Sequence, residues 1–208
     1  MSQNKPHTPK EAWAALVEGN HRFVSGEPAH PRQDIDRREA LAEKQVPFAA
    51  LFGCADSRLS AEIIFDVGLG DLFVVRNAGQ VIAETILGSL EYSVEVLGVP
   101  LILVLGHDEC GAIRATIDST EGKLNSQGEF IHNLVARIQP TVEAANREGK
   151  FEIDDITELH IQDTINELLT RSTLIAKAVK EGRLGVVGAN YRLALGEIHP
   201  IVTVGDIN

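Results

Sequence analysis

The sequence has no long hydrophobic run, no excess of basic residues and no linker. Its longest apolar stretch, around Val99 to Leu105, is far too short to span a bilayer. With 19 Lys and Arg against 30 Asp and Glu, the net charge is −11. This balance disfavours nucleic acid and anionic membranes as partners, because both attract a basic surface.

No stretch rich in Pro, Ser and Gly divides the 208 residues, and 44% of them are hydrophobic. The chain can therefore bury a sizeable core, and we predict one domain over residues 1–208, with an N-terminal helical arm over about 1–35. The first eight residues have no apolar signal core, so we expect a cytoplasmic protein.

Cysteine is scarce, and both cysteines lie in short polar clusters. The first cluster is Cys54-Ala-Asp-Ser-Arg58, and the second is His107-Asp-Glu-Cys110. Two thiolates and an imidazole are ligands that zinc selects, and three protein ligands leave one coordination position free. Since there is no third cysteine to close the site, this ligand set favours a catalytic zinc.

Both clusters follow apolar runs that read as buried strands. The alternation of such runs with amphipathic stretches predicts a βαβαβ order, and thus an α/β fold with a mainly parallel central sheet of four strands flanked by helices. In a parallel sheet Cys54 and His107 would both emerge at carboxyl ends, where α/β sheets form their ligand crevice. The predicted strands are 48–52, 72–75, 101–105 and 184–188, with a weaker C-terminal strand pair over 191–204; the predicted helices are 9–23, 35–44, 83–97, 129–147 and 154–180.

A helix that starts just after His107 would place Cys110 in its first turn, where the helix N-terminus favours a thiolate. Three other interpretations of the two cysteines remain. Each cysteine could simply be a small buried apolar residue, the two could form a Cys54–Cys110 disulfide, or they could hold a structural zinc with Asp56 as permanent fourth ligand. Arg58 argues against the last, because a guanidinium fork can hold Asp56 as an acceptor beside the metal instead.

Four motifs together resemble the β-class carbonic anhydrases in order and spacing. They are Gly53-Cys-Ala-Asp-Ser-Arg58, Phe73-Val-Val-Arg-Asn-Ala-Gly79, the segment from Ile86 to Tyr92, and Gly106-His-Asp-Glu-Cys-Gly111. The resemblance extends from about Trp13 to Gly185, which is most of the chain. It implies that Cys54, His107 and Cys110 bind Zn²⁺ and that Asp56 and Arg58 form the catalytic dyad, with Asp56 as a fourth ligand in a closed state.

The resemblance also implies a carbon dioxide pocket shared across a dimer interface, so we expect a homodimer or a higher homo-oligomer. The substrate-binding positions are Gln45, Phe73, Ala78, Tyr92 and Gly111. Some family members carry a tryptophan three residues before the first zinc cysteine, where it helps to form an inhibitory bicarbonate site. This chain has Leu51 there, although Arg76 matches an arginine of that site, and we predict no strong bicarbonate pocket.

The activity expected from these residues is the reversible hydration of carbon dioxide to bicarbonate and a proton by a zinc-bound hydroxide. A carbon disulfide or carbonyl sulfide hydrolase on the same scaffold, or a non-catalytic zinc protein, are the alternatives. We expect Asp108 and Glu109 to face solvent. The remaining histidines are interpreted as surface or packing residues: His7, His21, His30, His132, His160 and His199.

Overall fold

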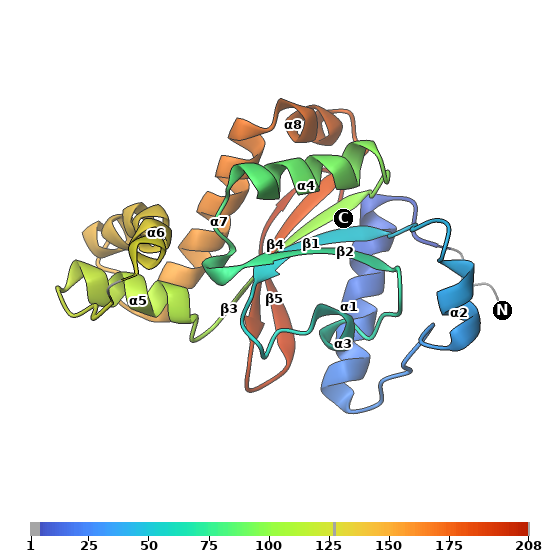
Figure 1. The fold of residues 1–208 in the computed structure, drawn as a ribbon, viewed down its shortest axis with the longest axis horizontal. Helices are drawn as coiled ribbons and strands as arrows, with labels where there is room; N and C mark the ends of the chain where they lie inside the picture. The colour runs from blue at the N-terminus through green and yellow to red at the C-terminus, as the bar shows by residue number, and fades with distance from the viewer. Residues whose placement is uncertain (1–4, 127, 208) are drawn as a thin grey trace.

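In a computed structural model, residues 5–126 and 128–207 are described and form an α/β fold around one five-stranded sheet (Figure 1). The strands are β1 (Ala49–Cys54), β2 (Leu72–Asn77), β3 (Leu101–His107), β4 (Gly185–Arg192) and β5 (Glu197–Val204). The helices are α1 (Pro9–Ser25), α2 (Ile35–Ala40), α3 (Ala61–Ile64), α4 (Glu84–Glu95), α5 (Gly111–Thr120), α6 (Glu129–Arg147), α7 (Ile153–Arg171) and α8 (Thr173–Lys180), with a 3₁₀ turn η1 (Ala78–Gln80).

The strand order is β2-β1-β3-β4-β5, and the first four strands are mutually parallel. The predicted parallel sheet is therefore confirmed, but it has five strands rather than four, because β5 joins it antiparallel to β4. The residues predicted as a separate C-terminal pair divide between the end of β4 and β5. The tight turn between Arg192 and Glu197 allows this hairpin, whose residues 193–196 bring the chain straight back along β4.

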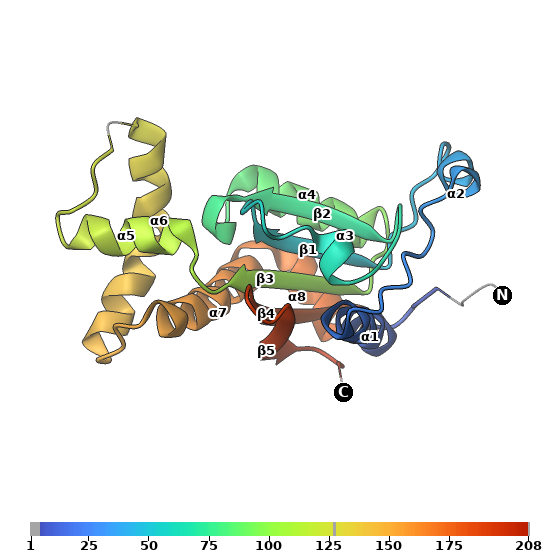
Figure 2. The same ribbon diagram turned by 90° about the horizontal axis from the view of Figure 1, so that it is seen from below.

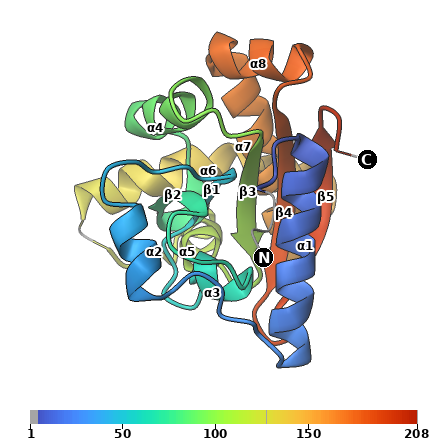
Figure 3. The ribbon, with the colours of Figure 1, turned by 90° about the vertical axis from the view of Figure 1, so that its right-hand side faces the viewer.

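Both faces of the sheet are covered by helices, and the alternation of side chains along each strand builds two cores. Along β1, Leu51 packs into the core formed with α1 and α3, whereas Phe52 packs into the core formed with α4, α7 and α8. Figure 1 shows α4 and α8 on one side of the sheet and α1 with α3 on the other, and Figure 3 shows α1 lying along β4 and β5.

Helices α5 and α6 lie beyond the carboxyl ends of the strands rather than over a face (Figure 2). They pack on each other and, more weakly, on α7. Cys110, at the start of α5, belongs to the same buried core as Ile113 of α5 and Ile138 of α6. No helix within the described residues is long and apolar enough to cross a membrane.

Two predicted helices differ from those observed. The stretch predicted as one helix over 154–180 is two helices, because Ser172 adopts an extended conformation, caps α8 by accepting the N–H of Ile175, and donates to the Glu91 carboxylate at 2.6 Å. Serine competes with helical hydrogen bonding in this way, which the apolar periodicity does not reveal. The helix predicted over 35–44 ends at Ala40.

Candidate metal centre

The two cysteine clusters meet because β1 and β3 are neighbours. Gly53 pairs with Leu105, so Cys54 and His107 leave the sheet at adjacent carboxyl ends. The chain then turns at Glu109, and Cys110 becomes the N-cap of α5. The predicted meeting of Cys54 and His107 at this edge of the sheet is thus confirmed, although Cys110 precedes the first helical turn rather than lying within it.

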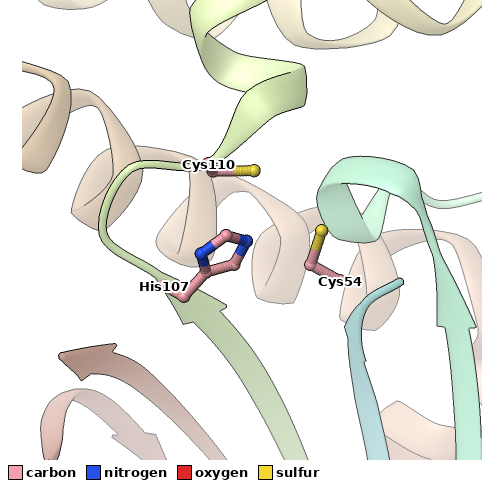
Figure 4. A group of neighbouring side chains, drawn as sticks. All are labelled: Cys54, His107 and Cys110. Carbon is pink, nitrogen blue, oxygen red and sulfur yellow. The ribbon is translucent and has the colours of Figure 1, made fainter. Parts of the chain in front are cut away.

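Cys54, His107 and Cys110 form a compact cluster with one ligand atom each. These three atoms all lie within 4.8 Å of one another, and the three residues are buried, with His107 fully enclosed. In Figure 4 the two sulfurs and the imidazole edge point toward one space between β1, β3 and α5. Both cysteines are free thiols, so the structure has no disulfide at this place.

The imidazole of His107 is oriented by its own neighbour. Its Nδ1 lies 2.7 Å from the Asp108 carbonyl oxygen, which can only accept, so Nδ1 carries the proton. Nε2 is then an unprotonated lone pair facing the cysteines, and it has no hydrogen-bond partner among the described residues. A buried acceptor without a partner is costly unless it binds something else, and an imidazole held by its other nitrogen is typical of a metal ligand.

The cluster also favours a thiolate at Cys54. Hydrogen bonds from the Cys110 thiol and from the Gly79 N–H, the latter at 3.3 Å, lower the pKa of Cys54 to about 4 against the effect of burial. Donating to Cys54 and being buried raise the pKa of Cys110. Burial opposes a charge on His107, but the Cys54 thiolate outweighs it and raises the pKa of His107.

A carboxylate and a guanidinium stand beside this cluster in the arrangement predicted from the sequence. Arg58 donates from Nε and Nη2 to the two oxygens of Asp56, at 2.9 and 2.7 Å, and its backbone N–H donates to the same carboxylate. These bonds hold the pKa of Asp56 well below its usual range. Asp56 Oδ2 lies 4.0 Å from His107 Nε2, so the carboxylate borders the ligand atoms while Arg58 occupies both its oxygens.

Arg76 braces the segment that carries Asp56. Its Nε donates to the Cys54 carbonyl at 2.8 Å and its Nη2 to the Asp56 carbonyl at 2.5 Å. The Arg76 guanidinium thus binds two backbone carbonyls within the first cysteine cluster. Leu51, which stands where some members of the family carry a tryptophan, is 2% exposed and belongs to the core.

The expectation that Asp108 faces solvent is correct only in part, because Asp108 is half-buried. Its carboxylate accepts the N–H of Leu193 at 2.8 Å, and its own N–H donates to the Tyr191 carbonyl. Asp108 therefore ties the loop that carries Cys110 to the end of β4. Glu109 is exposed, as expected.

The five residues predicted to bind substrate are divided by the structure. Ala78 and Gly111 adjoin the cluster, next to Gly79 and Cys110, and both are exposed. Phe73 and Tyr92 contact each other, with ring centroids 6.1 Å apart, but Phe73 pairs with Ala50, four residues before Cys54 on β1. Gln45 is exposed and precedes β1, whereas Cys54 ends it. Within one chain, the structure does not bring Gln45 to the cluster.

The cluster fits zinc. Tetrahedral coordination with Zn–S of about 2.3 Å and Zn–N of about 2.0 Å separates ligand atoms by about 3.5 to 3.8 Å, within the span found here. The free Nε2 lone pair and the stabilised Cys54 thiolate are the forms that bind a metal. Three protein ligands would leave one coordination position of a bound zinc free.

Comparison with known proteins gives a consistent result. Residues 49–198 match the family model described as carbonic anhydrase. The chain is 47% identical to a carbonic anhydrase of Mycolicibacterium smegmatis, over 96% of each chain. It is 49% identical to carbonic anhydrase 2 of Mycobacterium tuberculosis, over 90% of this chain and 91% of that protein.

Solved structures share the fold. The β-carbonic anhydrase CcaA superposes with a TM-score of 0.71 at 25% identity, covering 93% of this chain and 98% of that one. A structure described as one of two tetrameric β-carbonic anhydrases from Sordaria macrospora gives a TM-score of 0.74 at 22% identity, over 93% and 98% of the two chains.

Proposed function

The chain belongs to the carbonic anhydrase family, in its β class, and from that premise we propose that it reversibly hydrates carbon dioxide to bicarbonate and a proton at a zinc ion held by Cys54, His107 and Cys110. The observation that carries the proposal is the Asp56–Arg58 pair at the edge of a buried Cys-His-Cys cluster. A structural zinc site needs a fourth protein ligand, whereas here Arg58 binds both oxygens of the nearest carboxylate, Asp56.

Zinc, when bound, lowers the pKa of a coordinated water toward about 7 and so supplies a nucleophile near neutral pH. The residues of the chain prepare the rest. Arg58 fixes the direction of Asp56, and because its hydrogen bonds keep Asp56 ionised, this carboxylate is always an acceptor for a proton on the nucleophile. The Arg76 bonds to the Cys54 and Asp56 carbonyls hold the ligand and the acceptor in a fixed relation.

Substrate contacts complete the proposal. Carbon dioxide carries no charge and needs a small dry pocket. Ala78 and Tyr92 are exposed in the single chain, so we propose that this pocket becomes dry when a second subunit covers Ala78 and the Phe73–Tyr92 pair. Because Gln45 lies at the opposite end of β1 from its own Cys54, we propose that it acts in the site of a second subunit, as in an active homodimer or higher homo-oligomer. We further propose that residues 1–208 form one domain and that the protein is cytoplasmic.

A stopped-flow assay of carbon dioxide hydration, run in parallel with carbonyl sulfide hydrolysis, tests the function. We expect hydration to dominate in the purified zinc-loaded protein and Cys54→Ser to lose it together with the metal. The matched control is Ser57→Ala, which changes an exposed hydroxyl in the same cluster and should retain both. Faster turnover of carbonyl sulfide would make the protein a hydrolase instead, and zinc binding without turnover of either gas would make it a non-catalytic zinc protein.

A further inference from the structure

A buried histidine reaches the metal cluster through the backbone. His160, on α7, is 5% exposed, and its Nε2 lies 2.7 Å from the Gly79 carbonyl oxygen. Because a carbonyl only accepts, Nε2 must carry the proton and donate it. Burial lowers the pKa of His160, which keeps the ring neutral and leaves this tautomer in place.

Gly79 is the residue whose N–H donates to Cys54 Sγ. It lies in the turn η1 with φ of 71°, a left-handed conformation that a side chain would strain. A Cβ at this position would also stand 2.8 Å from Ala112 Cβ and 2.9 Å from Ile138 Cδ1. The Gly79 backbone thus packs closely against α5 and α6, and both its N–H and its carbonyl are hydrogen-bonded.

We propose that His160 is a positioning residue for the metal centre, which holds the Gly79 turn so that its N–H points at Cys54 Sγ. The proposal rests on the proposed zinc site. His160 does not itself touch the cluster; it fixes one backbone carbonyl, and the N–H of the same residue contacts the sulfur.

The N–H to sulfur bond matters because it stabilises charge on the thiolate in a buried place. Without the His160 hydrogen bond, a left-handed turn at Gly79 can relax, and the N–H leaves the sulfur. Groups that orient the ligands of a metal typically change its affinity about 10- to 100-fold when removed. We expect a loss of this size for zinc when the donor at His160 is absent.

The surroundings of His160 provide a matched control. Thr164, one turn further along α7, is 3% exposed and donates to the His160 carbonyl at 2.7 Å. Both residues line a cavity of about 30 Å³ together with Arg137, Thr141 and Asp163, which is room for about one water molecule. A change at Thr164 therefore disturbs the same helix and cavity without removing the bond to Gly79.

The experiment compares zinc affinity in three variants by competition with a chromophoric chelator. In His160→Gln the side-chain amide nitrogen can take the place of Nε2, so we expect affinity within about 3-fold of the unmodified protein. In His160→Asn the amide is one bond shorter and cannot reach Gly79, so we expect a loss of about 10- to 100-fold. Thr164→Val is expected to lose stability but to keep the zinc affinity.

Cobalt substitution adds a readout that a merely structural role would not change. The thiolate-to-cobalt charge-transfer band should shift in His160→Asn and remain in place in Thr164→Val. Equal zinc affinity in the folded Asn and Gln variants, or the same loss in Thr164→Val as in His160→Asn, would overturn the proposal.

Two further outcomes keep the result decisive. If His160→Asn does not fold, ¹⁵N NMR of the unmodified protein decides, because a proton on Nε2 of His160 supports the bond to Gly79 and a proton on Nδ1 refutes it. If the unmodified protein binds zinc but does not hydrate carbon dioxide, the proposed function fails while the role of His160 stands. An unmodified protein that binds no zinc removes both.

Discussion

Gln45 offers the sharpest test of how the site is assembled. β1 runs from Ala49 to Cys54, and five residue steps of about 3.3 Å separate its ends by about 16 Å. Gln45 lies four residues before that strand, so its side chain cannot contact substrate at the metal centre of its own chain. If it hydrogen-bonds substrate, it must do so across a subunit interface.

The prediction follows from counting sites. Gln45→Ala removes a hydrogen bond to bound substrate whose loss costs about 1 to 3 kcal/mol, so the hydration rate should fall about 5- to 150-fold. Cys54→Ser should be inactive through loss of the metal. In a mixed dimer of one Gln45→Ala chain and one Cys54→Ser chain, the site on the Gln45→Ala chain keeps its metal and receives an intact Gln45 from the partner. Random mixing makes half the dimers mixed, and half of their sites complete.

Co-refolding the two variants in equal amounts should therefore restore about one quarter of the unmodified hydration rate, measured by stopped flow at equal total protein. The matched control mixes Cys54→Ser with Cys110→Ser, in which every site lacks a ligand on its own chain. If the first mixture shows only its residual Gln45→Ala activity, or if sedimentation finds a fully active monomer, Gln45 has no role in a shared site.

Three other changes test separate parts of the account. Asp56→Asn should retain zinc but lose turnover by about 100-fold, since the amide is not a charged acceptor; a rate near that of the unmodified protein would remove the dyad from the mechanism. Hydration measured against bicarbonate at fixed pH and ionic strength should show simple product inhibition, because Arg76 is bound to the Cys54 and Asp56 carbonyls and Leu51 offers no donor; cooperative inhibition abolished by Arg76→Ala would contradict this. Asp66, buried beneath Arg22 and the N–H groups of Ala29 and His30, should stabilise the fold by about 2 to 4 kcal/mol in urea unfolding at pH 7. Burial raises the pKa of Asp66, but these hydrogen bonds lower it below the unfolded value of about 3.9. The stabilisation is therefore complete well above pH 4 and is lost as pH falls through the folded pKa. Asp66→Asn should reduce the loss of stability on acidification, and an unchanged loss would assign the acid sensitivity to other groups.

The sequence was enough to predict the parallel sheet and the meeting of Cys54 with His107, because both depend on apolar runs and on the rule that parallel strands end at one edge. It was also enough to predict the Asp56–Arg58 pair, whose spacing of two lets one side chain reach the other. The helix over 129–147 was predicted with its observed ends, since strong apolar periodicity defines it.

The parts that the sequence did not reveal depend on long-range contacts. Ser172 breaks a helix by bonding Glu91, 81 residues away, and nothing local distinguishes it from a helical serine. His160 reads as an ordinary packing residue until α7 is seen to bring it to Gly79, also 81 residues away. Asp108 likewise finds its partner on the hairpin between β4 and β5, which no periodicity indicates.

The central claim is that zinc is held by two thiolates and one imidazole of this chain. Zinc K-edge X-ray absorption of the purified protein tests it directly, because sulfur and nitrogen scatterers differ in distance and strength. The account predicts about one zinc per chain with two sulfurs at about 2.3 Å and an imidazole nitrogen at about 2.0 Å, all lost in Cys54→Ser. A spectrum without sulfur, or with zinc that survives Cys54→Ser unchanged, would contradict it.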